Sequence, residues 1–356
     1  MHERAPEFAV YGASLGNPGG TGVYLRRLLE GFDILGDPSV SVAMPEGLMS
    51  PGEALRSRPP GVFAKVFAEH LSIPAAIRTA GIRLVHFPAF SGRAPGGAAT
   101  VVTVHDLAFA ANPGWFPAVR AAWYRMAFPR VARNASLVLA DSVFTASELR
   151  KRLGIERVRT VYLCAGRPSG AAREPGVEGV SGDYLLFVGT IEPRKNILAL
   201  LEAMPAIRAA RPGLELVVAG RWGWGDAALL ERLHKTPGCR WTGHLDRESL
   251  EAAYAGARLL VYPSLYEGFG LPPLEAASVG VPFVIGPAES LKEVYGGVAA
   301  ASCGPDSGSI AAAVLSALDS EPDRDGLISF AAGFSPERMA RETLDAYRSC
   351  LHGGEA

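Results

Sequence analysis

Cysteine and long apolar runs are both scarce in this sequence of 356 residues. The four cysteines are Cys164, Cys239, Cys303 and Cys350. No two of them form a C-x-x-C pair, which excludes a disulfide framework or a cysteine-based zinc site and favours reduced, packing thiols. No apolar stretch approaches the roughly 20 residues of a bilayer-spanning helix, and acidic Glu3 and Glu7 are unlike a secretory signal. We therefore expect a soluble protein of the cytoplasm.

An overall excess of charge of one sign is also absent, because 35 Lys and Arg stand against 36 Asp and Glu. No basic run resembles a nucleic-acid-binding arm, so no nucleic-acid partner is expected. The two halves differ, however: residues 1–165 hold 18 basic and 12 acidic residues, and the rest hold 17 and 24. We expect the basic first half to face an anionic partner, such as a phosphorylated acceptor or an acidic membrane surface.

Short apolar stretches alternate with helical ones along most of the chain. One core rarely organises a chain of this length, so two domains are expected. Continuous apolar strands separated by helices are typical of parallel sheets covered on both faces. The sequence thus predicts an α/β protein with two Rossmann-like, doubly wound parallel-sheet domains. The predicted strands lie near Phe8–Tyr11, Val40–Ala43, Leu84–Phe87, Thr100–Val104, Leu137–Ala140, Val158–Leu163, Tyr184–Val188, Leu214–Ala219, Arg258–Tyr262, Pro282–Ile285 and Val298–Ala301.

Composition also predicts where the domains divide. Residues 166–183 are rich in Gly and Pro without an apolar period, so they are the expected linker between an N-terminal domain, 1–165, and a C-terminal domain, 184–333. Ser335 and Pro336 are typical of a helix start. The helix that they open, within residues 334–356, is expected to cross back to the first domain.

One glycine-rich segment follows the predicted strand that ends at Tyr262 and carries two glutamates, Glu267 and Glu275. A helix beginning near Pro272 or Pro273 would direct the amides of residues 268–271 at a ligand, and helix N-termini favour phosphate. Gly268 and Gly270 allow close backbone approach. The carboxylates would repel a diphosphate unless they bind sugar hydroxyls, so the segment points to a nucleotide sugar.

A second segment, Gly189 to Asn196, lies directly between a predicted strand and a helix. Its adjacent cations, Arg194 and Lys195, have the charge needed to neutralise a diphosphate. Ligands of parallel α/β sheets bind at the carboxyl ends of strands, where this segment lies. The alternative is a surface basic pair beside Glu192.

With these motifs the chain resembles the family-4 retaining glycosyltransferases of the GT-B fold, in which two Rossmann-like domains face a central cleft. The resemblance covers nearly the whole chain. The matching pieces are Gly19-Gly20-Thr21-Gly22, His86-Phe87, Thr103-Val104-His105-Asp106, Asp141 to Ser147, Val188-Gly189 with Arg194-Lys195, and Glu267-Gly-Phe-Gly-Leu-Pro-Pro-Leu-Glu275.

For the second domain, the resemblance implies that Glu267 contacts the transferred sugar and that Glu275 holds the ribose hydroxyls. Arg194 and Lys195 would neutralise the diphosphate leaving group without a divalent metal, so no metal or other cofactor is expected. The amides of Phe269, Gly270 and Leu271 would assist at the phosphates and sugar.

For the first domain, the resemblance implies that the loop Gly19-Gly20-Thr21-Gly22 closes over the donor phosphates ahead of a helix at Val23–Phe32. His105 would lie close to the transferred sugar, with Asp106 as a weaker candidate. Each motif has an alternative that stays open. The glycines could form only a helix-initiating turn. Independently, His105 and Asp106 could form a hydrogen-bonded pair at a strand end without a role in binding.

The stretch from Trp115 to Arg133 interleaves aromatic side chains with arginines. As a helix it would rest on an anionic membrane or contact a lipid diphosphate acceptor, which makes a peripheral location at the inner face of the membrane one expectation. The alternative is a half-buried helix with a solvated basic face.

Together these features predict an enzyme that moves a hexose, with mannose favoured, from a GDP- or UDP-linked donor to a hydroxyl of a glycan, lipid-diphosphate-linked or small-molecule acceptor. Transfer would retain the anomeric configuration by a same-face mechanism. Two other functions stay open. One is a nicotinamide-dependent oxidoreductase, although no strand is followed by G-x-G-x-x-G; the other is a non-catalytic sugar-nucleotide-binding subunit.

Overall fold

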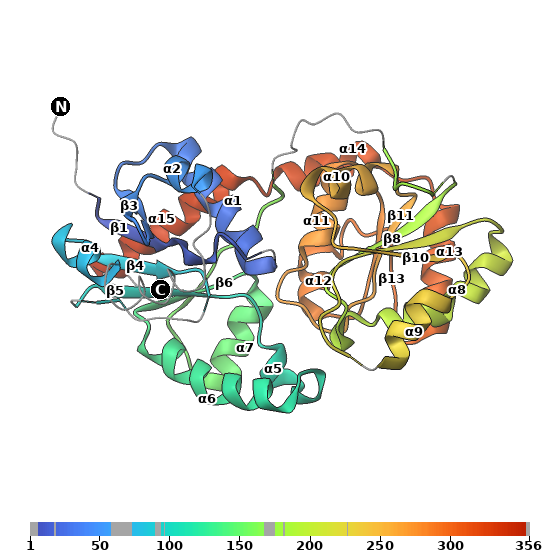
Figure 1. The fold of residues 1–356 in the computed structure, drawn as a ribbon, viewed down its shortest axis with the longest axis horizontal. Helices are drawn as coiled ribbons and strands as arrows, with labels where there is room; N and C mark the ends of the chain where they lie inside the picture. Colours follow the sequence, from blue (N-terminus) through green and yellow to red (C-terminus); the bar gives the residue numbers. More distant parts are fainter. Residues whose placement is uncertain are drawn as a thin grey trace. The chain divides into compact units, whose positions relative to one another are not determined.

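The computed structural model describes residues 6–17, 19–57, 73–89, 94–95, 97–166, 175–180, 182–225 and 227–353. The chain divides into two compact units, each built on its own mainly parallel sheet (Figure 1). The first unit comprises Met1–Leu107, Ala122–Cys164 and Phe334–Ala356, and the second comprises Ala108–Ala121 and Ala165–Gly333. Half of the linker predicted at 166–183 lies outside the described residues.

The first unit contains a seven-stranded sheet in the order β3-β2-β1-β4-β5-β6-β7. Each strand predicted in this part of the chain is present, although the last ends at Thr160 rather than Leu163. The antiparallel β3 was not predicted, since it has only three residues and none is fully buried. The strands are β1 (Phe8–Tyr11), β2 (Val40–Met44), β3 (Gly47–Met49), β4 (Leu84–Phe87), β5 (Ala99–Val104), β6 (Leu137–Ala140) and β7 (Val158–Thr160).

Helices that follow these strands cover the sheet. A short 3-10 turn, η1 (Gly12–Ser14), leads from β1 toward α1. The α-helices are α1 (Gly20–Leu35), α2 (Pro51–Arg56), α4 (Ile73–Thr79), α6 (Ala118–Asn134), α7 (Val143–Leu153) and α15 (Pro336–His352). The first turn of α6 is grouped with the second unit, together with α5 (Ala108–Ala111) and η3 (Pro113–Trp115).

The C-terminal helix α15 belongs to the first unit, although the second unit precedes it in sequence. Ser335 caps its first turn and Pro336 occupies the first helical position. The buried ring of Tyr347 contacts Phe8 at a centroid distance of 5.3 Å. Its hydroxyl also hydrogen-bonds the buried His86 imidazole at Nδ1, 2.6 Å away. Apolar contact and a satisfied buried polar pair therefore hold α15 in place.

The second unit contains a six-stranded, entirely parallel sheet in the order β10-β9-β8-β11-β12-β13. The strand β10 was not predicted, because polar residues interrupt its apolar character. The strand expected at Val298–Ala301 begins only at Ala301. The strands are β8 (Tyr184–Val188), β9 (Glu215–Ala219), β10 (Cys239–Gly243), β11 (Leu259–Tyr262), β12 (Phe283–Ile285) and β13 (Ala301–Ser302).

Both faces of this sheet carry helices, and the apolar side chains of α8, α9 and α13 form a continuous core with one face. The elements are η4 (Pro193–Lys195), α8 (Ile197–Ala210), α9 (Ala227–Lys235), α10 (Arg247–Gly256), α11 (Leu271–Ser278), α12 (Glu289–Tyr295), α13 (Ser307–Asp319) and α14 (Arg324–Ala332). Among the described residues, no helix is long and apolar enough to cross a membrane.

Each sheet reverses its strand order once, between β1 and β4 in the first unit and between β8 and β11 in the second. In open parallel sheets, ligands bind beyond the carboxyl ends of the strands at such a reversal. The two segments singled out in the second half of the sequence follow β8 and β11. The topology therefore places both at the reversal point of one sheet.

The packing of α1 against α15 makes a stability prediction. A Cβ added at Gly31 would lie 2.1 Å from the carbonyl oxygen of Pro336, so Gly31→Ala must displace the backbone of α15. We expect a loss of about 1–3 kcal/mol in the free energy of unfolding, measured by urea denaturation. Gly20→Ala in the same helix is the matched control, since nothing lies within 4 Å of that position. Equal stability of the two variants would contradict this packing account.

Candidate active site

A cluster of charged side chains lies at the carboxyl ends of β8 and β11. Glu267 accepts hydrogen bonds from Lys195 Nζ at 2.5 Å through Oε1 and from Arg194 Nη1 at 2.8 Å through Oε2. The Tyr262 hydroxyl also donates to Oε1, at 2.8 Å. Tyr262 in turn accepts from Lys195 Nζ at 2.7 Å. The structure thus brings together Arg194, Lys195 and Glu267, as the sequence predicted, and adds Tyr262.

The turn after β8 presents the two cations through a short 3-10 helix. Pro193 opens η4, and Asn196 ends it with a left-handed φ of 58°, which asparagine tolerates better than most residues. The side-chain amide of Asn196 donates to the carbonyl of Pro305 at 2.9 Å. Arg194 and Lys195 therefore occupy a locally fixed turn between β8 and α8.

Two hydrogen bonds to main-chain carbonyls join this turn to the loop after β11. The amide of Leu265 donates to the carbonyl of Arg194 at 2.8 Å. The Arg194 guanidinium donates back to the carbonyl of Tyr266 at 3.0 Å. Because both loops are fixed to each other at the main chain, the cations and Glu267 do not depend on side-chain contacts alone for their positions.

Burial and charge pairing set the protonation of Glu267. Burial alone would raise the pKa of this carboxyl, but the positive charges of Lys195 and Arg194 outweigh burial and lower it to about 2. The pKa of Lys195 is lowered, because burial and the neighbouring Arg194 cation outweigh the attraction of the two carboxylates. Glu267 is therefore ionised at neutral pH and can act only as a hydrogen-bond acceptor.

The alternative of a solvated surface pair at Arg194 and Lys195 is wrong. Glu192, which accepts from Arg194 Nε at 2.6 Å, is only 3% exposed, and Lys195 is 7% exposed. Buried charges are retained where they are paired or serve a ligand, since desolvation costs several kcal/mol for each ion. Lys195 is therefore buried and Arg194 partly buried, each beside a carboxylate, rather than solvated at the surface.

The glycine-rich turn before α11 is shaped by close packing. Gly270 has a φ of 87°, and a Cβ there would lie 2.4 Å from the Leu291 side chain. The Tyr295 hydroxyl donates to the carbonyl of Gly270, and Ser290 Oγ donates to the carbonyl of Glu267. These contacts from α12 fix the course of the chain through the predicted Gly268, Phe269 and Gly270.

The start of α11 differs slightly from the prediction. The helix begins at Leu271, so Pro272 and Pro273 occupy the next two positions and contribute no N–H. Any amide donation to a ligand must therefore come from the segment 268–271. Glu275 lies in the second turn rather than the first, where its carboxylate accepts from the Tyr254 hydroxyl of α10 at 2.7 Å.

Gly189 directly follows β8 and lies beside the turn that follows β9. A Cβ at Gly220 would lie 1.8 Å from the carbonyl oxygen of Gly189, so the two turns are in backbone contact. The Gly189 amide donates to the carbonyl of Ala219 at 2.9 Å. Gly189 thus holds the turn after β8, which leads to Arg194, against the turn after β9.

In the first unit, His105 follows β5 and is held at both ring nitrogens. Nε2 lies 2.9 Å from the carbonyl of Pro88, and Nδ1 lies 2.8 Å from Asp141 Oδ2. A carbonyl only accepts, and an ionised carboxylate only accepts, so the arrangement favours an imidazolium paired with Asp141. The alternative that His105 is a hydrogen-bonded histidine at a strand end is correct in this respect. The carboxylate in its described hydrogen bonds is that of Asp141.

Several charges act on this imidazole. Burial lowers the pKa of His105, but the Asp141 carboxylate, the hydrogen bonds and Asp106 together raise it above its ordinary value. Burial also raises the pKa of Asp141, partly offset by His105. By contrast, burial and the nearby His105 lower the pKa of His86 to about 3. Of these two histidines, His105 therefore has the raised pKa and His86 the lowered one.

The glycines Gly19, Gly20 and Gly22 are part of a helix start. Gly19 is the N-cap of α1, so Gly20, Thr21 and Gly22 lie in its first turn rather than in a loop before Val23. A Cβ at Gly22 would lie 1.8 Å from the carbonyl oxygen of Asn17. A helix-initiating turn is therefore present. The roles of this turn, of His105 and of Asp106 toward a donor stay predictions.

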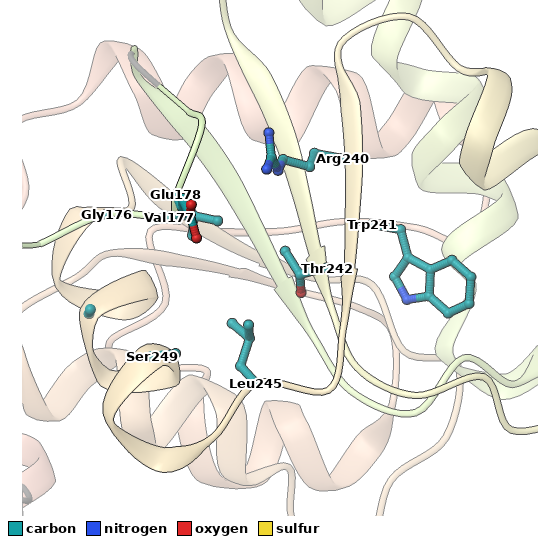
Figure 2. A pocket seen from close by; sticks show the side chains of 9 residues that line it. Gly176, Val177, Glu178, Arg240, Trp241, Thr242, Leu245 and Ser249 are labelled. Atoms are coloured by element: carbon teal, nitrogen blue, oxygen red, sulfur yellow. The ribbon is translucent and has the colours of Figure 1, made fainter.

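A separate pocket of about 550 Å³ lies in the second unit between β10 and α10, and Figure 2 shows its lining. Arg240 and Thr242 project from β10, Leu245 comes from the loop before α10, Ser249 from the first turn of α10, and Glu178 lies on another side. None of the predicted site residues lines it. This hollow is therefore distinct from the charged cluster.

Two Rossmann-like units in one chain, with a charged site at the strand ends, are the architecture of the GT-B glycosyltransferases. Solved structures agree with this assignment. Sucrose-phosphate synthase from Thermosynechococcus elongatus aligns with a TM-score of 0.72 at 19% identity, over 98% of this chain and 100% of the other. HepE from Anabaena, solved with UDP and glucose, aligns with a TM-score of 0.62 at 17% identity, over 96% and 99%.

Sequence comparisons identify the family. The description "Glycosyltransferase Family 4" matches residues 18–166, and "Glycosyl transferases group 1" matches residues 182–320. The O-antigen chain mannosyltransferase B of Escherichia coli is 33% identical over 267 residues, or 70% of each chain. A glycogen synthase of Mycobacterium tuberculosis is 31% identical over 62% of this chain and 54% of its own. The chain belongs to glycosyltransferase family 4.

This membership confirms the predicted fold and the predicted class of enzyme, a glycosyltransferase. The oxidoreductase alternative is wrong, and so is a purely non-catalytic subunit.

Sequence reasoning missed Tyr262, Asp141 and Tyr254 as partners of site residues. Tyr262 had one available signal, since a hydroxyl ends the otherwise aliphatic strand Leu259–Tyr262. Asp141 similarly follows the aliphatic β6 at its carboxyl end. Polar residues at the ends of neighbouring parallel strands meet at one edge of the sheet, so both were within reach of the same rule that found Lys195.

The protonation of Glu267 makes a prediction about pH. Its pKa is lowered from 4.5 in the unfolded chain to about 2 in the fold, so its stabilisation is complete above pH 4.5 and is lost as pH falls toward 2. Glu267→Gln should lower the free energy of unfolding by about 3 kcal/mol at pH 7. Urea unfolding at several pH values should show the gap between wild type and variant narrowing in acid. A gap that stays constant with pH would contradict the assignment.

The His105–Asp141 pair makes a second prediction. The carboxylate of Asp141 raises the pKa of His105, so Asp141→Asn should lower that pKa below its wild-type value. Proton NMR of the histidine rings measures this, with His105→Gln to assign the resonance. His86 is an internal control, because its pKa of about 3 keeps it neutral over the pH range in which His105 is titrated. An unchanged His105 titration in Asp141→Asn would rule out the ion pair.

Proposed function

We propose that this glycosyltransferase moves a hexose, with mannose favoured, from a GDP- or UDP-linked donor to a hydroxyl group with retention of anomeric configuration. The observation that carries the proposal is the buried cluster of Arg194, Lys195, Tyr262 and Glu267 at the strand reversal of the second unit. Two cations beside an ionised carboxylate suit a ligand with an anionic diphosphate and a sugar.

The cations would act on the leaving group. When the bond between the anomeric carbon and the diphosphate oxygen breaks, negative charge accumulates on the phosphate. Arg194 and Lys195 in a buried setting stabilise that charge more strongly than they would in water. Among the described residues, Lys195 donates two hydrogen bonds, to Tyr262 and Glu267, and its third N–H remains for a phosphate oxygen.

Glu267 would serve the sugar as a fixed acceptor. Its pKa of about 2 keeps it ionised, so it cannot protonate a leaving group at neutral pH. Three donors already engage its two oxygens, which reduces its nucleophilicity. These constraints favour same-face attack by the acceptor hydroxyl over a covalent intermediate on Glu267. In that step the acceptor oxygen bonds to the anomeric carbon, and its proton passes to the departing phosphate.

We propose that no divalent metal takes part. The charge that a metal would supply to the diphosphate is provided by Arg194 and Lys195. In the described part of the chain, no three His, Cys, Asp or Glu side chains are grouped to hold a metal ion. The structure of HepE with UDP and glucose supports a nucleotide-sugar donor, and the similarity to an O-antigen chain mannosyltransferase supports mannose as the sugar.

The acceptor in this proposal is a glycan, a lipid-diphosphate-linked sugar or a small molecule, modified in the cytoplasm. The similarity to an O-antigen chain mannosyltransferase over 70% of both chains supports a place in surface-polysaccharide assembly. Glu275 would hold the ribose hydroxyls of the donor from α11, in place of or together with its present donor, Tyr254.

The proposal is tested with labelled GDP-mannose, UDP-glucose and related donors, by following transfer or slow donor hydrolysis. Lys195→Ala and Arg194→Ala should each lower kcat by about 100- to 1000-fold, the usual cost of one transition-state donor. Arg232→Ala is the control, because Arg232 forms an exposed pair with Glu202. Full activity in Lys195→Ala would refute the site.

The stereochemistry of the product is read in the same experiment. Proton NMR of the new glycosidic bond should show the α configuration of the donor retained. An inverted product would refute the same-face mechanism while leaving the transferase assignment intact.

A further inference from the structure

The outward face of α6 exposes large apolar side chains in a row. Val119 is 85% exposed, Trp123 52% and Met126 61%. Their spacing of four and three residues places them on one side of the helix. The opposite side carries Ala121, Phe128 and Ala132, which are buried. The helix is therefore anchored by one apolar face and presents a second one outward.

The same helix is basic and carries no carboxylate. Residues 118–134 contain Arg120, Arg125, Arg130 and Arg133 and no Asp or Glu. Arg130 and Arg133 follow Met126 by four and seven residues, so they lie on the outward face, and both are exposed. Arg120 is set apart, since its guanidinium lies over the Trp224 ring. We call Val119, Trp123, Met126, Arg130 and Arg133 the α6 outer face.

The C-terminal end of α7 extends this basic surface. Arg133 donates to the carbonyl of Leu153 at 3.4 Å, and Arg157 donates to the carbonyl of Arg133 at 3.2 Å. Figure 1 shows α6 and α7 side by side in the first unit. Lys151 and Arg152 precede Leu153. Residues 143–157 contain two acidic residues, Glu148, which pairs with Arg152, and Glu156, against four basic ones, Arg150, Lys151, Arg152 and Arg157.

We infer that the α6 outer face binds the surface of an anionic lipid bilayer. Trp123 and Met126 would enter the boundary between headgroups and acyl chains, while the arginines reach lipid phosphates from the same face. Each arginine near an anionic surface contributes about 1 kcal/mol. This contact is independent of the transfer chemistry, and it would hold the enzyme beside a lipid-linked acceptor.

The positive charge of the α6 outer face and its single narrow row of apolar side chains favour a bilayer over other occupants. A second copy of the chain would bring two basic faces together, which costs free energy. The centre of a protein interface is depleted in charge, whereas here a single apolar row is bordered by arginines. An anionic bilayer needs no complementary shape, and it can accept the apolar side chains and the arginines of this face at the same time.

The experiment is sedimentation of the full chain with vesicles of phosphatidylcholine, with and without phosphatidylglycerol. Binding is expected only when phosphatidylglycerol is present, and it should weaken with added salt. Arg130→Gln with Arg133→Gln should reduce binding about 25-fold, or about fivefold for each arginine. Trp123→Ser with Met126→Ser should also reduce it, and brominated lipids should quench wild-type fluorescence more than that of Trp123→Phe.

Two double variants at exposed positions elsewhere are the matched controls. Arg211→Gln with Arg232→Gln is the control for the arginine variant, and Leu198→Ser with Ile328→Ser is the control for the apolar variant. They should bind like wild type, and circular dichroism should show all variants folded. No binding of wild type to anionic vesicles, or equal binding by the α6 variants, would overturn the inference. Transfer to a water-soluble acceptor without vesicles separates this result from the proposed function, since the α6 variants should retain it.

Discussion

The pairing of a buried carboxylate, Glu267, with the buried Lys195 and the partly buried Arg194 is the interaction on which the site of the second unit depends. None of these charges could remain desolvated alone, because an unpaired buried ion costs several kcal/mol. Their mutual compensation also joins the turn after β8 to the loop after β11. The same ion pairs therefore neutralise the buried charges and fix the two loops of the site against each other.

The first unit applies the same physical rule with a different pair. His105 and Asp141 follow the neighbouring strands β5 and β6 and meet at the edge of the sheet, where each compensates the other's charge. In both units a parallel sheet delivers polar residues to one edge while its strands stay apolar. An enzyme of this family can therefore combine a stable core with charged strand ends, because the two occupy different parts of each strand.

Most of the fold was predictable because buried parallel strands are continuous apolar runs, which the sequence displays directly. The strands β3 and β10 were missed for the opposite reason: neither is fully buried, so neither needs an apolar run. Arg194, Lys195 and Glu267 were predictable as residues that follow strands. Tyr262 and Asp141 also lie at strand ends and could have been selected by the same rule, but their partners, Lys195 with Glu267 and His105, could not be named before the order of the strands was known.

The sequence by itself determined which residue types follow each strand, where the glycine-rich turns lie and to which family the motifs are similar. Tertiary structure alone decided the partners and their protonation. Lys195 and Glu267 are 72 residues apart, and they meet because the sheet order places β8 beside β11. Burial then decides that a pair resembling a surface ion pair is desolvated. Pairing and burial depend on the packing of distant segments, which no local pattern encodes.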